Sequence, residues 1–146
     1  MNRARVQTQL SIDEGVVYEV YLDSLGYPTF GIGHLILEKD QEDGINIGTP
    51  VSKARVTEVF QADLDTAISE CKVLYGMWCT FPDEVQEILV NMMFNLGRPR
   101  LSRFRNFKKA VDAHDWKQAA IDGRDSKWYR QVGNRAERLM VRMENV

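Results

Sequence analysis

The sequence has few of the residues that build disulfide frameworks and metal sites. It holds two cysteines and two histidines in 146 residues. Cys71 and Cys79 are too few for a disulfide framework and lack the paired spacing of a zinc site, so we expect both to be reduced, with Cys71 in a core. His34 and His114 share no ligand spacing. We therefore expect no metal and no cofactor.

The chain also lacks a long apolar run and an excess of charge of one sign. Its longest apolar stretch, 87–94, is interrupted by polar side chains and is far shorter than the ~20 residues that span a bilayer. The 19 basic and 21 acidic residues leave a net charge of −2, which gives no general attraction for nucleic acid. We expect neither membrane insertion nor a nucleic-acid partner.

No internal repeat or low-complexity segment divides the sequence. Its length and its hydrophobic fraction of 44% suit one ordinary core, or two small lobes that share a long element. We therefore expect a single domain over residues 1–146, and a monomer.

The first third of the chain is typical of a helix followed by a β-hairpin. Residues 3–14 carry apolar side chains four apart and precede Gly15, the usual residue after a helix end. Residues 16–22 are β-branched and aromatic, and 23–26 indicate a turn before the apolar segment 27–32. These patterns predict two antiparallel strands.

The rest of the chain is predicted to be mainly helical. A third strand is expected near 35–37, and the polar, glycine-bearing residues 40–50 indicate a loop that could act as a hinge or lid. Apolar residues three and four apart predict one long helix over 52–75, roughly 35 Å at 1.5 Å per residue, with Ser52 as its cap. Further helices are expected over 82–97, 103–113, 115–121, 126–131 and 134–143. The fold class is α+β, with a small N-terminal sheet lobe joined by a long helix to a mainly helical C-terminal lobe, and a cleft between the lobes.

Two carboxylates beside the predicted hairpin suit the cleavage of a glycosidic bond. That reaction needs a protonated acid at the leaving oxygen and a second carboxylate across the sugar, as nucleophile or to activate water. Glu14 ends the first predicted helix, and Asp23 lies in the turn nine residues later. Thr29 follows on the return strand, where its hydroxyl could hold a water beside Asp23. Surface acids and a strand threonine at such intervals also occur in many proteins without a site.

The sequence motif around Glu14, Asp23 and Thr29 is more specific than the intervals between these three residues alone. It reads as a glutamate, eight residues, an aspartate, five residues, then a threonine and Gly-Ile-Gly-His, fitted by Glu14, Asp23, Thr29 and 31–34. This closely resembles the catalytic hairpin of the phage T4-type lysozymes, glycoside hydrolase family 24. The resemblance continues through 59–63, 91–97, 126–131 and 134–138, and so covers nearly the entire chain.

The resemblance implies a muramidase that cleaves the β-1,4 bond between N-acetylmuramic acid and N-acetylglucosamine in bacterial peptidoglycan, with inversion. Glu14 would be the general acid, and Asp23 with Thr29 would position and activate water. The residue types agree with these roles, because a threonine next to the aspartate is useful for holding a water. Direct attack by the aspartate would instead need a closer carboxylate pair, ~5–5.5 Å apart rather than ~6.5–9.5 Å.

Further residues are assigned by the resemblance alone. Arg135 would pair with Glu14, as an orienting rather than a tuning group, because a cation lowers the pKa of a neighbouring acid. His34 would form a structural ion pair with Asp63. The positions that meet the sugars and peptide stems would be Gly33, Leu35, Phe94 and Asn95, although the apolar members of that set also suit an ordinary core.

The resemblance further implies a bacteriophage protein that breaks the host wall during release or entry. The first ten residues lack the apolar segment of a signal peptide, so we expect the host cytoplasm, with access to the wall through a separate pore-forming protein. One alternative is a non-catalytic wall-binding or structural module of a phage tail, which the intact Glu14, Asp23 and Thr29 argue against. Another is a transglycosylase-like lyase, which uses a glutamate but does not need the aspartate and threonine.

Overall fold

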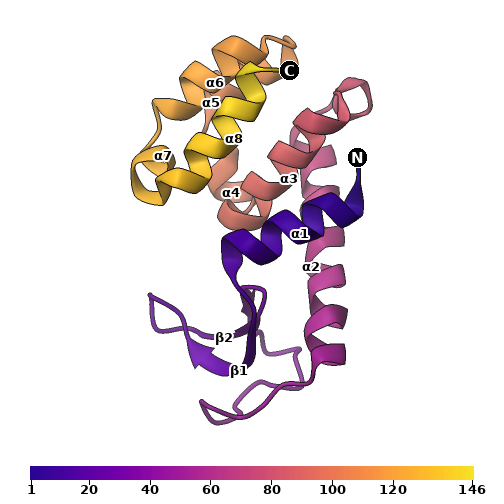
Figure 1. Cartoon of the computed structure of the whole chain (residues 1–146), viewed down its shortest axis with the longest axis vertical. Coiled ribbons are helices and arrows are strands. Elements are labelled where there is room, and N and C mark those ends of the chain that lie inside the picture. Colours follow the sequence, from indigo (N-terminus) through magenta and orange to yellow (C-terminus); the bar gives the residue numbers. More distant parts are fainter. The chain divides into compact units, whose positions relative to one another are not determined.

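The computed structural model describes all 146 residues, which form three strands and eight α-helices (Figure 1). The chain divides into two compact units, one of residues 7–65 and one of residues 1–6 with 66–146. Helices α1 (Arg3–Glu14) and α2 (Lys53–Leu74) each contribute residues to both units. The α+β class expected from the sequence is confirmed, since a small sheet precedes a mainly helical part.

The unit of residues 7–65 contains an antiparallel sheet in the order β1-β2-β3. Its strands are β1 (Val17–Leu22), β2 (Pro28–Gly31) and the short β3 (His34–Leu35), which lies close to the third strand expected from the sequence. A later segment follows the free edge of β1, where the Val20 N–H donates to the Thr49 carbonyl at 3.0 Å. The sheet is therefore covered on its β1 edge by the chain that leads into α2.

The register of the sheet separates two sets of side chains. Tyr21 pairs with Thr29, and Thr29 pairs with Leu35, so these three form one row across the strands. Directly paired residues point to the same face, and neighbours along a strand point to opposite faces. Phe30 and His34 therefore belong to the other face, where Phe30 is completely buried.

The unit of residues 1–6 and 66–146 is helical and is built around α3 (Asp83–Leu96). Apolar side chains along α3 are buried from Val85 to Leu96, which confirms the predicted helix at the centre of the helical core. Helix α6 packs against both α5 and α8 (Figure 1). The remaining helices are α4 (Arg98–Leu101), α5 (Arg105–Asp112), α6 (Trp116–Arg124), α7 (Lys127–Val132) and α8 (Asn134–Glu144).

Most of the helices agree with the sequence patterns, and two short elements do not. The sequence did not predict α4 or the 3-10 turn Trp78–Thr80, because four or fewer residues are too short to show a helical period. Cys71 is buried, as expected, and Cys79 is exposed. None of the helices combines the length and the apolar character needed to cross a membrane.

An ion pair to a buried glutamate fastens the start of α1 to α3 within this unit. Glu87 is only 3% exposed, and Arg5 donates to both of its carboxylate oxygens at 2.7 Å. The Asn2 N–H adds a third bond to the same carboxylate at 2.9 Å. Burial opposes ionisation of Glu87, but the bonds from Arg5 and Asn2 outweigh it and lower the pKa of Glu87.

Replacing Arg5 by methionine keeps much of the aliphatic stem and removes two of the bonds to Glu87. We expect Arg5→Met to lower the free energy of unfolding, because the buried carboxylate of Glu87 loses the side chain that donates to both of its oxygens. Urea unfolding at neutral pH measures the difference. Arg130→Met, at an exposed arginine on α7, is the control and should change stability little. Equal effects of the two substitutions would contradict this view of Glu87.

Candidate active site

Asp23 follows β1 directly and shapes the turn of the hairpin. Its Oδ1 accepts the backbone N–H groups of Leu25 and Tyr27, both at 2.9 Å. The Asp23 N–H also donates to the Tyr27 carbonyl at 2.9 Å. Since both side-chain bonds fall on Oδ1, the second oxygen, Oδ2, remains available as an acceptor for a ligand or water.

Thr29 is connected to the same turn through Tyr27. The Thr29 hydroxyl donates to the Tyr27 carbonyl at 2.9 Å, and the residue is only 4% exposed. A hydroxyl has one hydrogen to donate, so the Thr29 oxygen acts toward any further group as an acceptor. Tyr27 therefore ties together the two side chains that were predicted to hold a water.

Glu14 is the last residue of α1, and its carboxylate lies against Gly33. A Cβ placed on Gly33 would stand 3.1 Å from Glu14 Oε2 and 3.5 Å from its Cδ. Gly33 also has a φ of 64°, a conformation that side chains disfavour. Gly33 was predicted to meet the sugar, and the structure shows in addition that it borders the predicted acid.

Tyr21 is the side chain that Glu14 and Asp23 have in common. Burial raises the pKa of Tyr21, and the charges of Glu14 and Asp23 raise it further. Both carboxylates therefore lie within electrostatic range of one phenol, whose strand partner is Thr29. Tyr21 therefore pairs with Thr29 across the strands and interacts electrostatically with Glu14 and Asp23. The sequence interpretation missed this residue, although the alternation along β1 would have placed it opposite the buried Val20.

His34, on the inner face of the sheet, is bonded to two carboxylates. Its Nδ1 lies 2.6 Å from Asp63 Oδ2, the partner expected from the resemblance, and its Nε2 lies 2.9 Å from Asp40 Oδ2, which was not expected. An ionised carboxylate can only accept, so two carboxylates favour a ring with a hydrogen on both nitrogens and a positive charge. Burial lowers the pKa of His34, but the two carboxylates outweigh it and raise the pKa above its usual value. No group of three or more His, Cys, Asp or Glu side chains is arranged to hold a metal.

The loop between β3 and α2 is held by buried charges. Asp40 accepts the Leu37 N–H at 2.8 Å as well as bonding His34. Glu42 is 6% exposed and forms a two-point ion pair with Arg55 of α2, both bonds being 2.9 Å. The carboxylates of this loop thus fasten it to β3 and α2. The hinge or lid expected from its composition stays a prediction.

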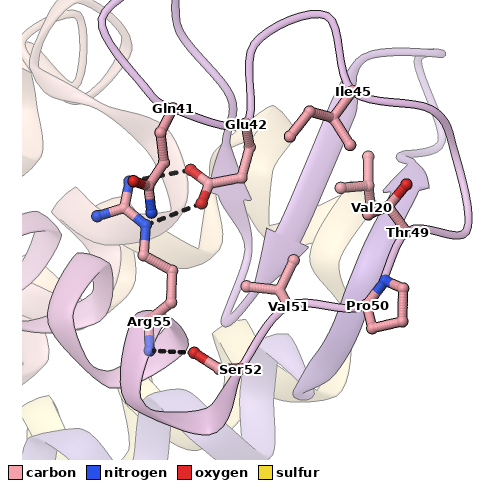
Figure 2. A pocket seen from close by; sticks show the side chains of 9 residues that line it. All are labelled: Val20, Gln41, Glu42, Ile45, Thr49, Pro50, Val51, Ser52 and Arg55. Carbon is pink, nitrogen blue, oxygen red and sulfur yellow. Dashed lines mark hydrogen bonds and ion pairs between the residues drawn. The ribbon is translucent and has the colours of Figure 1, made fainter.

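A hollow of about 400 Å³ lies between this loop, β1 and the start of α2. Figure 2 shows the Glu42–Arg55 pair on one side and Val20 with Ile45 across from it. The Arg55 N–H donates to Ser52 Oγ at 3.1 Å, which is the helix cap expected from the sequence (Figure 2). None of the predicted catalytic or sugar-binding residues lines this hollow, so it is separate from the candidate site.

Three of the predicted residues belong to the helical unit. Asn95 accepts a hydrogen bond from Trp128 Nε1 at 2.9 Å, and Phe94 beside it is partly exposed. Arg135 is 8% exposed and donates from Nε to Asn91 Oδ1 at 3.0 Å. The expected sugar contacts of Phe94 and Asn95, and the pairing of Arg135 with the acid, stay predictions. Leu35, in the sheet row, is 45% exposed and so is not an ordinary core residue.

Comparison with known proteins identifies the family of the chain. The family model described as phage lysozyme matches residues 11–145, which include Glu14, Asp23 and Thr29. The chain belongs to the phage lysozyme family. Membership confirms the resemblance seen in the sequence, and supports a glycosidase-type hydrolase with a lysozyme-like fold.

Relatives of this phage lysozyme domain differ greatly in length. The chain is 33% identical over 147 residues to the pre-baseplate central spike protein of Enterobacteria phage T4, covering 88% of this chain and 26% of that protein. It is 27% identical over 154 residues to the probable T4-type lysozyme 2 of Dictyostelium discoideum, covering 92% and 91%. It is 29% identical over 125 residues to a peptidoglycan hydrolase of Pseudomonas phage phiKMV, covering 86% and 13%. The family domain thus occurs both nearly alone and as a small part of long chains.

The contact between Gly33 and Glu14 leads to a prediction for activity. Gly33→Ala should lower kcat about tenfold, because the added methyl group displaces the carboxylate by a few tenths of an ångström and misplaced reacting groups are costly. Gly44→Ala is a matched control, since Gly44 has a φ of 76° and open space at the Cβ position. It should lose stability in the same way and keep its kcat. A rise in KM alone for Gly33→Ala would show that the methyl group meets the sugar instead of Glu14.

The charges around His34 lead to a prediction for stability against pH. The contribution of His34 is complete below its unfolded pKa and is lost as the pH rises through its raised folded pKa. Burial raises the pKa of Asp40, but the hydrogen bonds from the Leu37 N–H and His34 outweigh burial and lower this pKa below its usual value. The contribution of Asp40 to stability is therefore lost as the pH falls through its lowered folded pKa. Asp40→Asn should therefore destabilise most between about pH 4 and pH 6.5.

Thermal unfolding of Asp40→Asn and the parent across pH 3–10 (about one unit per step) tests this window. Asp43→Asn, an exposed position in the same loop, should show no such maximum. A difference from the parent that stays constant across the scan would rule out the two-carboxylate arrangement.

Proposed function

We propose that this chain hydrolyses bacterial peptidoglycan at the β-1,4 bond between N-acetylmuramic acid and N-acetylglucosamine, with inversion at the anomeric carbon. The observation that carries the proposal is that Tyr27 joins Asp23 and Thr29 in the hairpin, while the Glu14 carboxylate lies against Gly33 beside β3 of the same sheet. The names of two relatives, a peptidoglycan hydrolase and a probable T4-type lysozyme, support the substrate and the reaction. The domain is proposed to act as a monomer, without metal or nucleic acid.

Asp23 and Thr29 have the hydrogen-bonding character that activation of water requires. The Thr29 hydrogen is committed to Tyr27, and Asp23 Oδ1 is committed to the turn. Thr29 Oγ1 and Asp23 Oδ2 are both acceptors, so a water that donates one hydrogen to each keeps a lone pair for the anomeric carbon. As the new C–O bond forms, the water proton passes to Asp23 Oδ2.

Glu14 supplies the other half of the reaction. Its protonated carboxyl gives a proton to the glycosidic oxygen while the old C–O bond breaks and its electron pair leaves with that oxygen. Water attacks from the opposite face of the sugar, so the β-linked substrate gives an α product. The reaction leaves Asp23 protonated and Glu14 ionised, and exchange with solvent restores both.

A second candidate function rests on the similarity to the phage T4 spike protein. In that case the domain would be a structural module of a phage tail that binds the wall without turnover. Reducing-end analysis of digested peptidoglycan separates the candidates: a hydrolase releases reducing sugars, a binding module releases none, and a lyase leaves anhydro ends.

The roles of the carboxylates predict the behaviour of two variants. Glu14→Gln removes the proton source and should lower the rate of reducing-end release by about 10²–10⁴-fold. Asp23→Asn keeps an oxygen for the two N–H groups of the turn but loses the base, so it should lower the rate similarly with little loss of stability. Full activity of either variant would contradict the assignment.

Two controls sharpen this experiment. Asp23→Ala removes the turn bonds as well, so its melting temperature should fall below that of Asp23→Asn. Thr29→Ser keeps the hydroxyl and should be more active than Thr29→Ala. The first anomer formed from a soluble peptidoglycan fragment, followed by NMR, should be α; an initial β product would contradict inversion.

A further inference from the structure

We propose that the hydroxyl of Tyr21 contacts the sugar at the cleavage site and donates a hydrogen bond to one of its exocyclic oxygens. This inference rests on the proposed function, and it adds a substrate-contacting residue to Glu14, Asp23 and Thr29.

Tyr21 lies on the same face of the sheet as Thr29. Tyr21 stands directly opposite Thr29, which stands directly opposite Leu35, so the three share one face. The neighbouring residues Val20 and Phe30 point to the other face and are completely buried. Tyr21 is partly exposed and Leu35 is 45% exposed, so both ends of this row are accessible to a ligand, while Thr29 between them is 4% exposed.

The phenol of Tyr21 is free to donate a hydrogen bond to a ligand. The Tyr21 hydroxyl makes no hydrogen bond within the protein, whereas Tyr129 in the helical unit donates its hydroxyl hydrogen to Glu137 at 2.5 Å. The nearby charges of Glu14 and Asp23 disfavour ionisation of Tyr21, so it stays a neutral O–H group. It is thus a hydrogen-bond donor without a partner in the protein, within electrostatic range of two carboxylates.

The sugar at the cleavage site offers oxygens that need a hydrogen-bond donor. The oxygens assigned to water, Thr29 Oγ1 and Asp23 Oδ2, both accept hydrogen bonds, so a sugar oxygen with only lone pairs needs a donor from elsewhere. A donor to the ring oxygen would withdraw electrons and oppose the oxocarbenium character of the transition state. The hydroxyl and acetamido oxygens outside the ring carry no such cost. Tyr21 is therefore suited to an exocyclic oxygen of an N-acetylhexosamine.

The test compares Tyr21→Phe with Tyr18→Phe, using the full chain and a soluble peptidoglycan fragment. Each variant loses one phenol from β1, but Tyr18 is not paired with Thr29. Tyr21→Phe should lower kcat/KM about two- to tenfold, the usual range for one neutral hydrogen bond, and Tyr18→Phe should change it less than about twofold. Both melting temperatures should stay within about 1 °C of the parent.

The outcomes separate this inference from the function on which it rests. Unchanged kcat/KM in Tyr21→Phe overturns the contact, and so does an equal loss in both variants. A loss of activity with a fall in melting temperature of more than about 4 °C assigns Tyr21 a structural role and also overturns it. If the parent releases no reducing ends, the proposed function itself fails. If the parent is active and Glu14→Gln is not, the proposed function stands, and the Tyr21→Phe result decides the role of Tyr21 alone.

Discussion

The register between β1 and β2 is the constraint on which the candidate site depends. The turn bonds of Asp23 fix the strands so that Tyr21 faces Thr29. A slip by one residue would turn Thr29 toward the core and bring the buried Phe30 to the surface. Exposing a side chain such as Phe30 costs about 1.5–3 kcal/mol. Apolar burial on one face of the sheet therefore holds the hydroxyl in place on the other.

The inner face of the same sheet carries charges that are nearly balanced. His34 stands between Asp63 and Asp40, and Arg55 lies 3.8 Å from Asp40 while it bonds Glu42. Two cations thus offset most of the charge of three carboxylates, which limits the cost of burying them. The loop after β3 owes its path to these pairs rather than to an apolar core. Chemistry on one face and charge compensation on the other are built on the same strands.

Sequence patterns predict the parts of this chain that depend on local chemistry. Helix α2 shows a long apolar period and a serine cap, and the hairpin shows two β-rich segments around a turn, so both were predictable. Glu14, Asp23 and Thr29 were found through a motif of fixed spacing. Asp40 was missed because its bond to His34 depends on the path of an irregular loop. Tyr21 was missed because one of its charged neighbours comes from the end of α1, a separate element.

The two oxygens of Asp23 have separate duties, since one shapes the backbone and the other is open to solvent and ligands. This division makes the position informative when related sequences are compared. Substitution of Asp23 by alanine or lysine would disturb the hairpin. Asparagine keeps the side-chain oxygen that accepts the N–H groups of the turn but has no ionisable group. A relative with asparagine at the position of Asp23 would thus keep the hairpin turn but lack the catalytic base. The identity of this one residue therefore distinguishes a relative that has lost catalysis from one that has also lost the hairpin.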